Sequence, residues 1–201
     1  MIKGVDISHW NYAAVKNWDF SQYTKDKFII MKASEGTGYK DNYVDFYSAR
    51  ILKDNPDPLF GYYHFAQAKS IDSAPAEAEN FLRSIEKYIN DVHLFPLLAL
   101  DVEADALKKS YIDIWSLHWL SYVEAKTGVK PLIYLQQSAL KKFPEVAKHN
   151  YGLWVARWSL LKPKTDPWKI YAIWQTGSLG KIDQDKFNGN LTAWHKYTGR
   201  L

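Results

Sequence analysis

Apolar and polar positions alternate in two ways along the first 150 residues. Nearly continuous apolar runs, typical of strands buried on both faces, fill five segments. These are 2–7, 28–33, 59–65, 97–103 and 131–135. Helical spacing of apolar residues fits four segments between them, strongly at 73–90 and 110–127 and weakly at 42–54 and 137–148. Alternating strands and helices predict a parallel sheet with right-handed crossovers.

The pattern changes after residue 150. Three further strands are expected at 153–158, 170–175 and 181–183, with little helical pattern between them. The connection 176–180 has the length of a hairpin, which requires antiparallel pairing. Eight strands are enough to close a small barrel filled by side chains. We therefore predict an α/β fold, a TIM-like barrel whose second half lacks helices, as a single domain over residues 1–201.

Composition adds an excess of aromatic residues, with 9 Trp, 14 Tyr and 9 Phe in 201 positions. Some must be core, and we expect this of Phe60, Phe81 and Trp115. A surplus indicates a groove for flat partners, either sugar rings or nucleotide bases. The formal charge of +4 is mild and no block of five Lys or Arg occurs, so nucleic acid is not expected as a partner.

Other classes are excluded more directly. The chain has no cysteine, which removes disulfides and thiolate chemistry. No apolar run approaches the roughly 18 residues of a membrane span, so no membrane insertion is expected. The N-terminus lacks a charged leader followed by an apolar stretch, and we expect no signal peptide.

Carboxylates gather at the predicted strand ends, where barrels of this type place their active sites. Asp101 and Glu103 flank Val102, so both side chains point to one side, with Cα atoms about 6.6 Å apart. Two carboxyls that close resist simultaneous ionisation, which raises a pKa and suits a general acid. Asp6 and Asp183, near the ends of other strands, would deepen the negative field.

Two other chemistries use some of the same residues. Asp6, Asp101, Glu103 and His64 could hold Mg²⁺, Ca²⁺ or Zn²⁺, but no His-x-His or His-x-x-x-His spacing supports this. Ser8, Ser34 and His64 could form a nucleophilic triad, but no Gly-x-Ser-x-Gly motif is present. We predict neither a metal site nor a cofactor.

A second group of residues is placed at strand ends beside the carboxylates and is expected to bind substrate. It comprises Trp10, Glu35, Tyr62, His64, Tyr134, Trp158 and Trp174. Core packing is the alternative role for each aromatic member of this group.

These pieces together resemble the glycoside hydrolase family 25 lysozymes, the Chalaropsis-type N-acetylmuramidases. Five motifs occur in the family's order along nearly the whole chain. They are GVDISHWN at 4–11, FIIMKASEG at 28–36, GYYHF at 61–65, ALDVE at 99–103 and IDQDKF at 182–187. One departure is Gln184-Asp185, where the family more often has an apolar residue and Asn.

The resemblance implies a flattened (β/α)5(β)3 barrel that hydrolyses the β-1,4 bond between N-acetylmuramic acid and N-acetylglucosamine. It implies Glu103 as the acid and Asp101 as the group that positions or stabilises the reacting sugar. Asp6 and Asp183 would tune the site. Inverting, retaining and substrate-assisted routes stay open, because strand geometry fixes Cα spacing and not carboxyl spacing.

The resemblance also implies bacterial peptidoglycan as the partner, with the enzyme acting on the cell wall as a monomer. We expect no separate wall-binding domain in this chain, and release through a holin pore or by another route. Two alternative functions are a non-catalytic sugar-binding barrel and a metal-dependent polysaccharide hydrolase.

Overall fold

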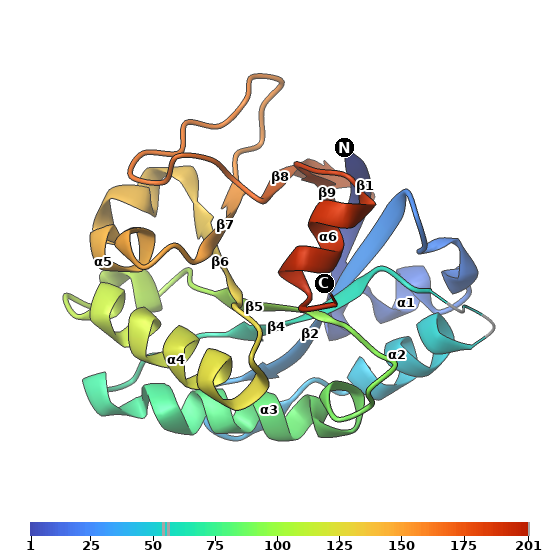
Figure 1. Ribbon diagram of the computed structural model, residues 1–201, viewed down its shortest axis with the longest axis horizontal. Coiled ribbons are helices and arrows are strands. Elements are labelled where there is room, and N and C mark those ends of the chain that lie inside the picture. Colours follow the sequence, from blue (N-terminus) through green and yellow to red (C-terminus); the bar gives the residue numbers. More distant parts are fainter. Residues whose placement is uncertain (54, 56, 201) are drawn as a thin grey trace.

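The computed structural model describes residues 1–53, 55 and 57–200. Eight strands form a closed ring, seen end-on in Figure 1. They are β1 (Ile2–Ile7), β2 (Lys27–Glu35), β4 (Phe60–Phe65), β5 (Leu97–Asp101), β6 (Leu132–Gln136), β7 (Gly152–Ala156), β8 (Ile173–Leu179) and β9 (Ile182–Phe187). The chain has the α/β barrel that the sequence predicts.

Within the eight-stranded ring, strand direction changes only at the last strand. Neighbouring strands from β1 through β8 pair in parallel, while β9 is antiparallel to both β8 and β1 and so closes the ring. Gly180 and Lys181 form the β8–β9 turn with φ of +58° and +68°, as a two-residue hairpin of type I′ requires. A short strand, β3 (Tyr39–Lys40), pairs with the end of β2.

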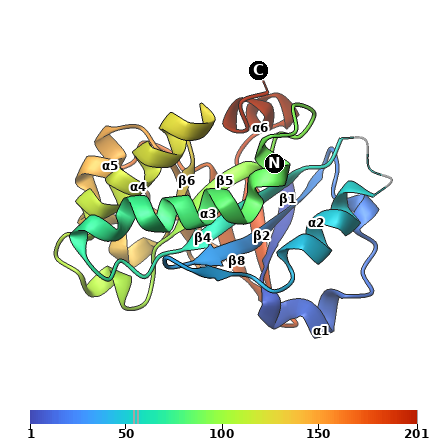
Figure 2. The ribbon, with the colours of Figure 1, turned by 90° about the horizontal axis from the view of Figure 1, so that it is seen from below.

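Helices cover one part of the ring and leave the other bare. They are α1 (Tyr12–Val15), α2 (Val44–Leu52), α3 (Ala74–Ile89), α4 (Ile112–Thr127) and α5 (Pro144–Lys148). Short 3-10 turns are η1 (His9–Asn11), η2 (Phe20–Gln22), η3 (Ile71–Ser73), η4 (Ala106–Lys108) and η5 (Gln137–Lys142). Figure 2 shows α3 and α4 side by side along the barrel. A long loop without a helix joins β7 to β8 (Figure 1).

Most predicted elements are confirmed. The strand expected at 97–103 ends at Asp101, and the helix expected at 137–148 is divided into η5 and α5. Further differences lie near the C-terminus. The strand expected at 170–175 begins at Ile173, and the last strand is longer than 181–183. A helix that the pattern did not predict, α6 (Leu191–Tyr197), follows β9. Residue 54, part of the predicted helix 42–54, lies outside the described residues.

Two apolar clusters explain why the strands read as continuous apolar runs. On β5, Leu98 and Leu100 pack outward against the helices, while Leu97 and Ala99 pack inside the barrel. Both faces are therefore buried, which hides the alternation in the sequence. Phe60, Phe81 and Trp115 are buried in the outer cluster, as expected.

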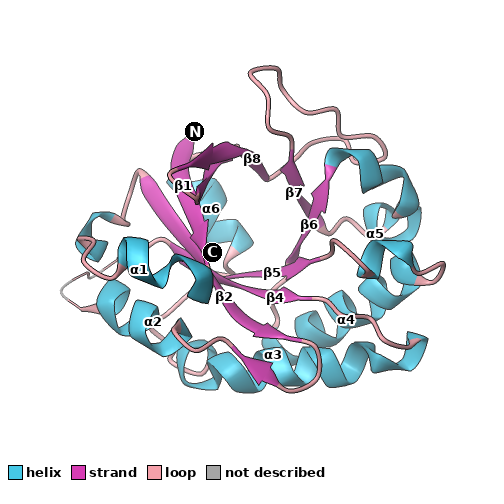
Figure 3. Ribbon diagram, turned by 180° about the vertical axis from the view of Figure 1, so that it is seen from behind, coloured by secondary structure: helices cyan, strands magenta, loops and turns pink. Residues whose placement is uncertain are grey.

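Helix α6 closes one end of the barrel, where Figure 3 shows it behind the strands. Its Trp194 is buried, with its ring centroid 5.0 Å from that of Phe28 and 5.3 Å from that of Phe187. With this end filled by aromatic rings, the interior opens at the opposite end, where the parallel strands terminate.

No helix among the described residues is long and apolar enough to span a bilayer.

Candidate active site

A small cavity of about 110 Å³ lies inside the barrel at the carboxyl ends of the parallel strands. The structure brings all four predicted carboxyls, Asp6, Asp101, Glu103 and Asp183, into its wall. Its full lining is Asp6, Tyr63, Asp101, Glu103, Tyr134, Trp154, Gln175 and Asp183. Residues from seven barrel strands and the loop after β5 therefore converge on a space large enough for a few atoms of a ligand.

Strand geometry explains this convergence. Asp101 ends β5 and follows the inward-facing Leu97 and Ala99 by two-residue steps, while Val102 is buried in the outer cluster. Asp183 comes near the start of β9, and because β9 is antiparallel it lies opposite Asp6 near the end of β1. The reversed last strand thus delivers its carboxyl to the same end of the barrel.

Gln175 on β8 connects the carboxyls to the aromatic wall. Its Oε1 accepts hydrogen bonds from Tyr134 Oη and Trp158 Nε1, both at 3.0 Å. Its Nε2 donates to Asp6 Oδ2 at 2.9 Å and to Asp183 Oδ2 at 3.4 Å. With both amide atoms engaged twice, the orientation of Gln175 is fixed, and it holds two of the carboxyls in place.

The site favours protonated carboxyls. Burial, and then the charge of Asp183, raises the pKa of Glu103, which Lys32 partly offsets. Burial, Glu103 and Asp6 together raise the pKa of Asp101 well above its ordinary value. Desolvation of the charged form and like-charge repulsion act in the same direction here. Glu103 is the less buried of the two, so it combines a retained proton with access from solvent.

The two outer carboxyls follow the same trend. Burial and Asp183 raise the pKa of Asp6 to about 7, although hydrogen bonds from Gln175 and Asp185 oppose the shift. Burial also raises the pKa of Asp183. A cluster of four adjacent carboxyls therefore carries fewer negative charges than its composition indicates.

Lys32 and Glu35 form an ion pair beside this cluster, with Lys32 Nζ 2.6 Å from Glu35 Oε2. Burial opposes ionisation of Glu35, but hydrogen bonds from Lys32 and Gln67 outweigh it and lower its pKa. The half-buried Glu35 is thus an ionised partner of the lysine. It is not among the residues that line the cavity.

Three of the aromatic residues predicted to bind substrate, Trp10, Tyr134 and Trp158, lie at different distances from the carboxyls. Tyr134 lines the cavity, and Trp158 reaches it through its bond to Gln175 while its side chain is 63% exposed. Trp10 is 84% exposed on η1, just after β1, and its ring is tilted against that of His9, with 4.6 Å between the centroids. Trp10 and Trp158 are thus exposed to a ligand that extends beyond the cavity, whereas Tyr134 can contact only the part of a ligand that enters it.

Three residues predicted to bind substrate lie on the outer face of their strands, which points away from the cavity. Tyr62 is fully buried in the outer cluster and hydrogen-bonds Ser48 Oγ at 2.8 Å. Trp174 packs in the same cluster and donates to the Arg157 carbonyl at 2.8 Å. His64 is also buried and points toward α3. Their burial contradicts a role in contacting substrate.

His64 belongs instead to a closed network. Its Nδ1 lies 2.8 Å from Ser34 Oγ and its Nε2 lies 3.1 Å from Glu77 Oε2. The Glu77 carboxyl also accepts backbone N–H bonds from Gln67 and Ala68, both at 2.9 Å. The arrangement imitates a Ser-His-Glu triad, but Ser34, His64 and Glu77 are each 0% exposed, which leaves a nucleophile no route to substrate.

The sequence analysis missed five residues of the barrel interior. They are Lys32, Tyr63, Trp154, Gln175 and Asp185. Side chains alternate between the two faces of a strand, so Tyr63 and Gln175 face inward while their neighbours Tyr62 and Trp174 face outward. Alternation shows which residues share a face, but both faces are largely apolar, so it does not show which face is inside.

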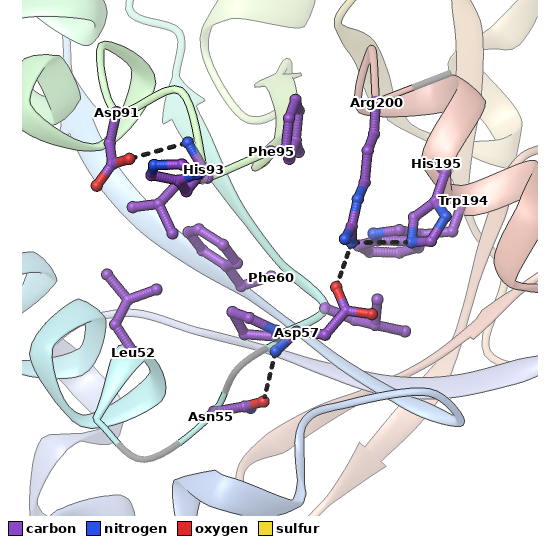
Figure 4. A pocket seen from close by; sticks show the side chains of 13 residues that line it. Leu52, Asn55, Asp57, Phe60, Asp91, His93, Phe95, Trp194, His195 and Arg200 are labelled. Carbon is purple, nitrogen blue, oxygen red and sulfur yellow. Dashed lines mark hydrogen bonds and ion pairs between the residues drawn. The ribbon is translucent and has the colours of Figure 1, made fainter.

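A second cavity, of about 230 Å³, lies among the residues drawn in Figure 4. Both of its carboxylates have partners in the protein: Asp57 is paired with Arg200, and Asp91 Oδ1 accepts a hydrogen bond from the His93 backbone N–H at 2.9 Å. Phe60 and Trp194 contribute rings that are already packed in the core. The cluster of four carboxyls in the smaller cavity has no counterpart among the described residues that line this one.

Comparison with known proteins decides the family. The model of the glycosyl hydrolases family 25 matches residues 5–185. The chain belongs to glycosyl hydrolase family 25. Lysozyme M1 from Streptomyces globisporus is 27% identical to this family 25 chain over 213 residues, covering 94% of the chain and 68% of the relative.

Two solved structures have the same fold. A family 25 lysozyme from Aspergillus fumigatus superposes with a TM-score of 0.79 at 28% identity, covering 98% of both chains. The catalytic domain of endolysin ply40 from bacteriophage P40 of Listeria monocytogenes gives 0.74 at 26% identity, covering 99% of this chain and 98% of that one. The protein is therefore a glycoside hydrolase of the lysozyme type, which acts on peptidoglycan.

Proposed function

We propose that this family 25 hydrolase cleaves the β-1,4 bond between N-acetylmuramic acid and N-acetylglucosamine, with Glu103 as general acid. One observation carries the proposal: Asp101, which ends β5, and Glu103, two positions later in the following loop, face the same cavity, and both have raised pKa values. A general acid must keep its proton near the working pH until the leaving oxygen takes it.

The roles of the two carboxyls follow from their surroundings. Glu103 is partly exposed and can reach a glycosidic oxygen at the mouth of the cavity. Asp101 is buried, and its Oδ1 has no hydrogen-bond partner in the protein. A buried acceptor without a donor loses free energy until a ligand supplies one. The N–H of a sugar 2-acetamido group is such a donor.

We favour a substrate-assisted route on these grounds. Glu103 gives its proton to the bridging oxygen as the C1–O bond breaks, and the acetamido carbonyl oxygen bonds to C1 to form an oxazolinium. Asp101 holds the acetamido N–H throughout. Glu103, now ionised, then takes a proton from water as the water oxygen attacks C1 and the oxazolinium ring opens. Two displacements at C1 retain the β configuration.

Exposed aromatic rings near the cavity favour binding of a glycan that extends beyond it. Trp10 and Trp158 lie beyond the cavity with large exposed faces, and Tyr134 lines its wall. Flat apolar faces of sugar rings can pack on such side chains while their hydroxyls stay hydrated. Action as a monomer and release through a holin pore stay predictions of the family resemblance.

Mass spectrometry of digested walls tests the bond. Purified peptidoglycan is treated with the wild-type chain, the new ends are reduced with borohydride, and the fragments are sequenced. Reduced muramic acid at the end is the expected result. Reduced glucosamine would make the enzyme a glucosaminidase, and binding without new reducing ends would leave a non-catalytic wall binder.

Proton NMR of the first product tests the route. Signal from the β-anomer before mutarotation is expected if the configuration is retained. Initial release of the α-anomer would mean direct attack by water and would overturn the substrate-assisted route.

A further inference from the structure

Asp185 is a buried carboxyl that the proposed reaction does not use. It lies on β9, where its Cα pairs with Gly4 of β1 on one side and with Gln175 of β8 on the other. The residue is 2% exposed. Its Oδ1 accepts a hydrogen bond from Trp154 Nε1 at 2.8 Å, but its buried Oδ2 has no donor. An ionised carboxyl would not be stable in such a place without another donor.

The Asp185 and Asp6 carboxyls are neighbours inside the barrel: Asp185 pairs with Gly4, two residues before Asp6 on β1, and Gln175, which pairs with Asp185, donates to Asp6. This proximity to Asp6, after burial, raises the pKa of Asp185. Ionised carboxyls only accept hydrogen bonds, so contact between two of them requires one proton to lie between them. Asp6 Oδ2 already accepts from Gln175 Nε2, and Asp185 Oδ1 from Trp154. The unpartnered Oδ2 of Asp185 is the oxygen left to carry the proton.

We propose that Asp185 holds this proton and donates it to Asp6, which makes Asp185 a positioning residue for the catalytic carboxyls. The bond fixes the Asp6 side chain, and Gln175 extends that order to Asp183 and Tyr134. The proposal deepens the function proposed above, on which its effect on activity rests. Asp185 itself is not among the residues that line the cavity.

The arrangement is sensitive to pH. Loss of the shared proton would leave two carboxylates in contact, and their repulsion would separate them and release Gln175. Burial, and then Asp6, raises the pKa of Asp185 well above its ordinary value, so the proton persists above the usual carboxyl range. Several groups of the barrel interior act directly on the pair: Tyr63, Asp101, Glu103, Tyr134, Trp154, Gln175 and Asp183. Lys32 faces the same interior and acts on Asp101 and Glu103.

Asn at position 185 is the informative substitution, because its amide can donate to Asp6 at every pH. In Asp185→Ala the donor is lost, and we expect kcat to fall about tenfold or more across the pH range. Asp185→Asn is expected to recover most of that loss and to move the alkaline limb of the pH profile upward by about one unit. Asp26→Asn, an exposed position before β2, is the matched control and should follow the wild type.

Carbon-13 NMR of the aspartate side-chain carboxyls gives a readout that does not depend on glycan cleavage. The Asp185 resonance is expected to titrate well above 3.8, its ordinary value, and to move down toward that value in Asp6→Asn. Because Asp6→Asn leaves position 185 unchanged, this measurement can be made even if the variants at position 185 fail to fold.

Titration of Asp185 near its ordinary value would overturn the proposal, whatever the activity. So would equal losses in Asp185→Asn and Asp185→Ala at every pH. If the wild type released no glycan fragments while the titration midpoint of Asp185 stayed above its ordinary value, the proposed function would be wrong. The proposal of a shared proton would still be supported.

Discussion

Two buried networks of ionisable groups lie on opposite faces of the same barrel wall. Inside, Asp6, Asp101, Glu103 and Asp183 surround a cavity. Outside, Ser34, His64 and Glu77 are packed between the strands and α3. On β4 the two regions are one residue apart, because Tyr63 faces the cavity and His64 faces the helix.

The two networks differ in whether their polar atoms are satisfied. Glu77 uses both carboxyl oxygens on donors from His64, Gln67 and Ala68. Inside the barrel, Asp101 Oδ1 and Asp185 Oδ2 lack donors, and the carboxyl pKa values are raised. A fully buried network whose hydrogen-bonding atoms all have partners stabilises the fold. A network with unpartnered acceptors and access to solvent can instead bind a ligand.

The largest expected effect is on activity at Glu103. Glu103→Gln keeps the size of the side chain but has no proton to give, so kcat on peptidoglycan should fall by about 10²–10⁴-fold. The free energy of unfolding should not decrease, since a buried acidic group is removed. Turbidity assays on cell walls and urea titration measure the two quantities, with Asp26→Asn as control. Near wild-type turnover would remove Glu103 from its role.

The fold was more predictable than the faces of its strands. Continuous apolar runs located the strands, and the hairpin-length gap correctly gave the antiparallel β8–β9 pair. The pair Asp101 and Glu103 was found because polar residues end an apolar run. Tyr62, His64 and Trp174 were assigned to the site because a strand apolar on both faces hides which side chains point inward.

Asp185 was missed for another reason. Its position next to Asp6 depends on the register between β1 and β9, which pairs strands from the two ends of the chain. Contacts over such sequence separation leave no local pattern. The sequence showed Asp185 only as a departure from the family motif.

The next effect is on stability at Glu77. Glu77→Ala leaves His64 and two backbone N–H groups without their acceptor inside the core, and we expect a loss of about 3–5 kcal/mol in the free energy of unfolding. The kcat of the folded fraction should stay near wild type. A selective loss of kcat with normal stability would reverse the roles assigned to the two networks.

The raised pKa of Asp101 inside the barrel predicts how the free energy of unfolding changes with pH. The unfolded chain loses the Asp101 proton near 3.8, but the folded state retains it to higher pH, so this group makes the fold less stable as pH rises from about 4. Asp101→Asn removes that dependence. Its stability relative to wild type should increase above pH 4 by at most about 1.4 kcal/mol per pH unit, measured by urea denaturation. A difference that does not change with pH would contradict the raised pKa.

The smallest effect is expected at Ser34. Ser34→Ala removes one buried hydrogen bond to His64, which should lower the free energy of unfolding by about 1 kcal/mol. Hydrolysis of peptidoglycan and of small esters should be unchanged from wild type. Loss of an esterase activity in this variant would mean that the outer network acts as a triad.

The ionisation of Glu103 in the free enzyme tests the central claim most directly. Carbon-13 NMR of the glutamate side-chain carboxyls, assigned with Glu103→Gln, follows its titration from pH 3 to 9. We predict a midpoint above its ordinary value of 4.5, which moves downward in Asp183→Asn because the neighbouring charge is removed. A midpoint at or below 4.5, unchanged by Asp183→Asn, would contradict the assignment of Glu103 as the acid.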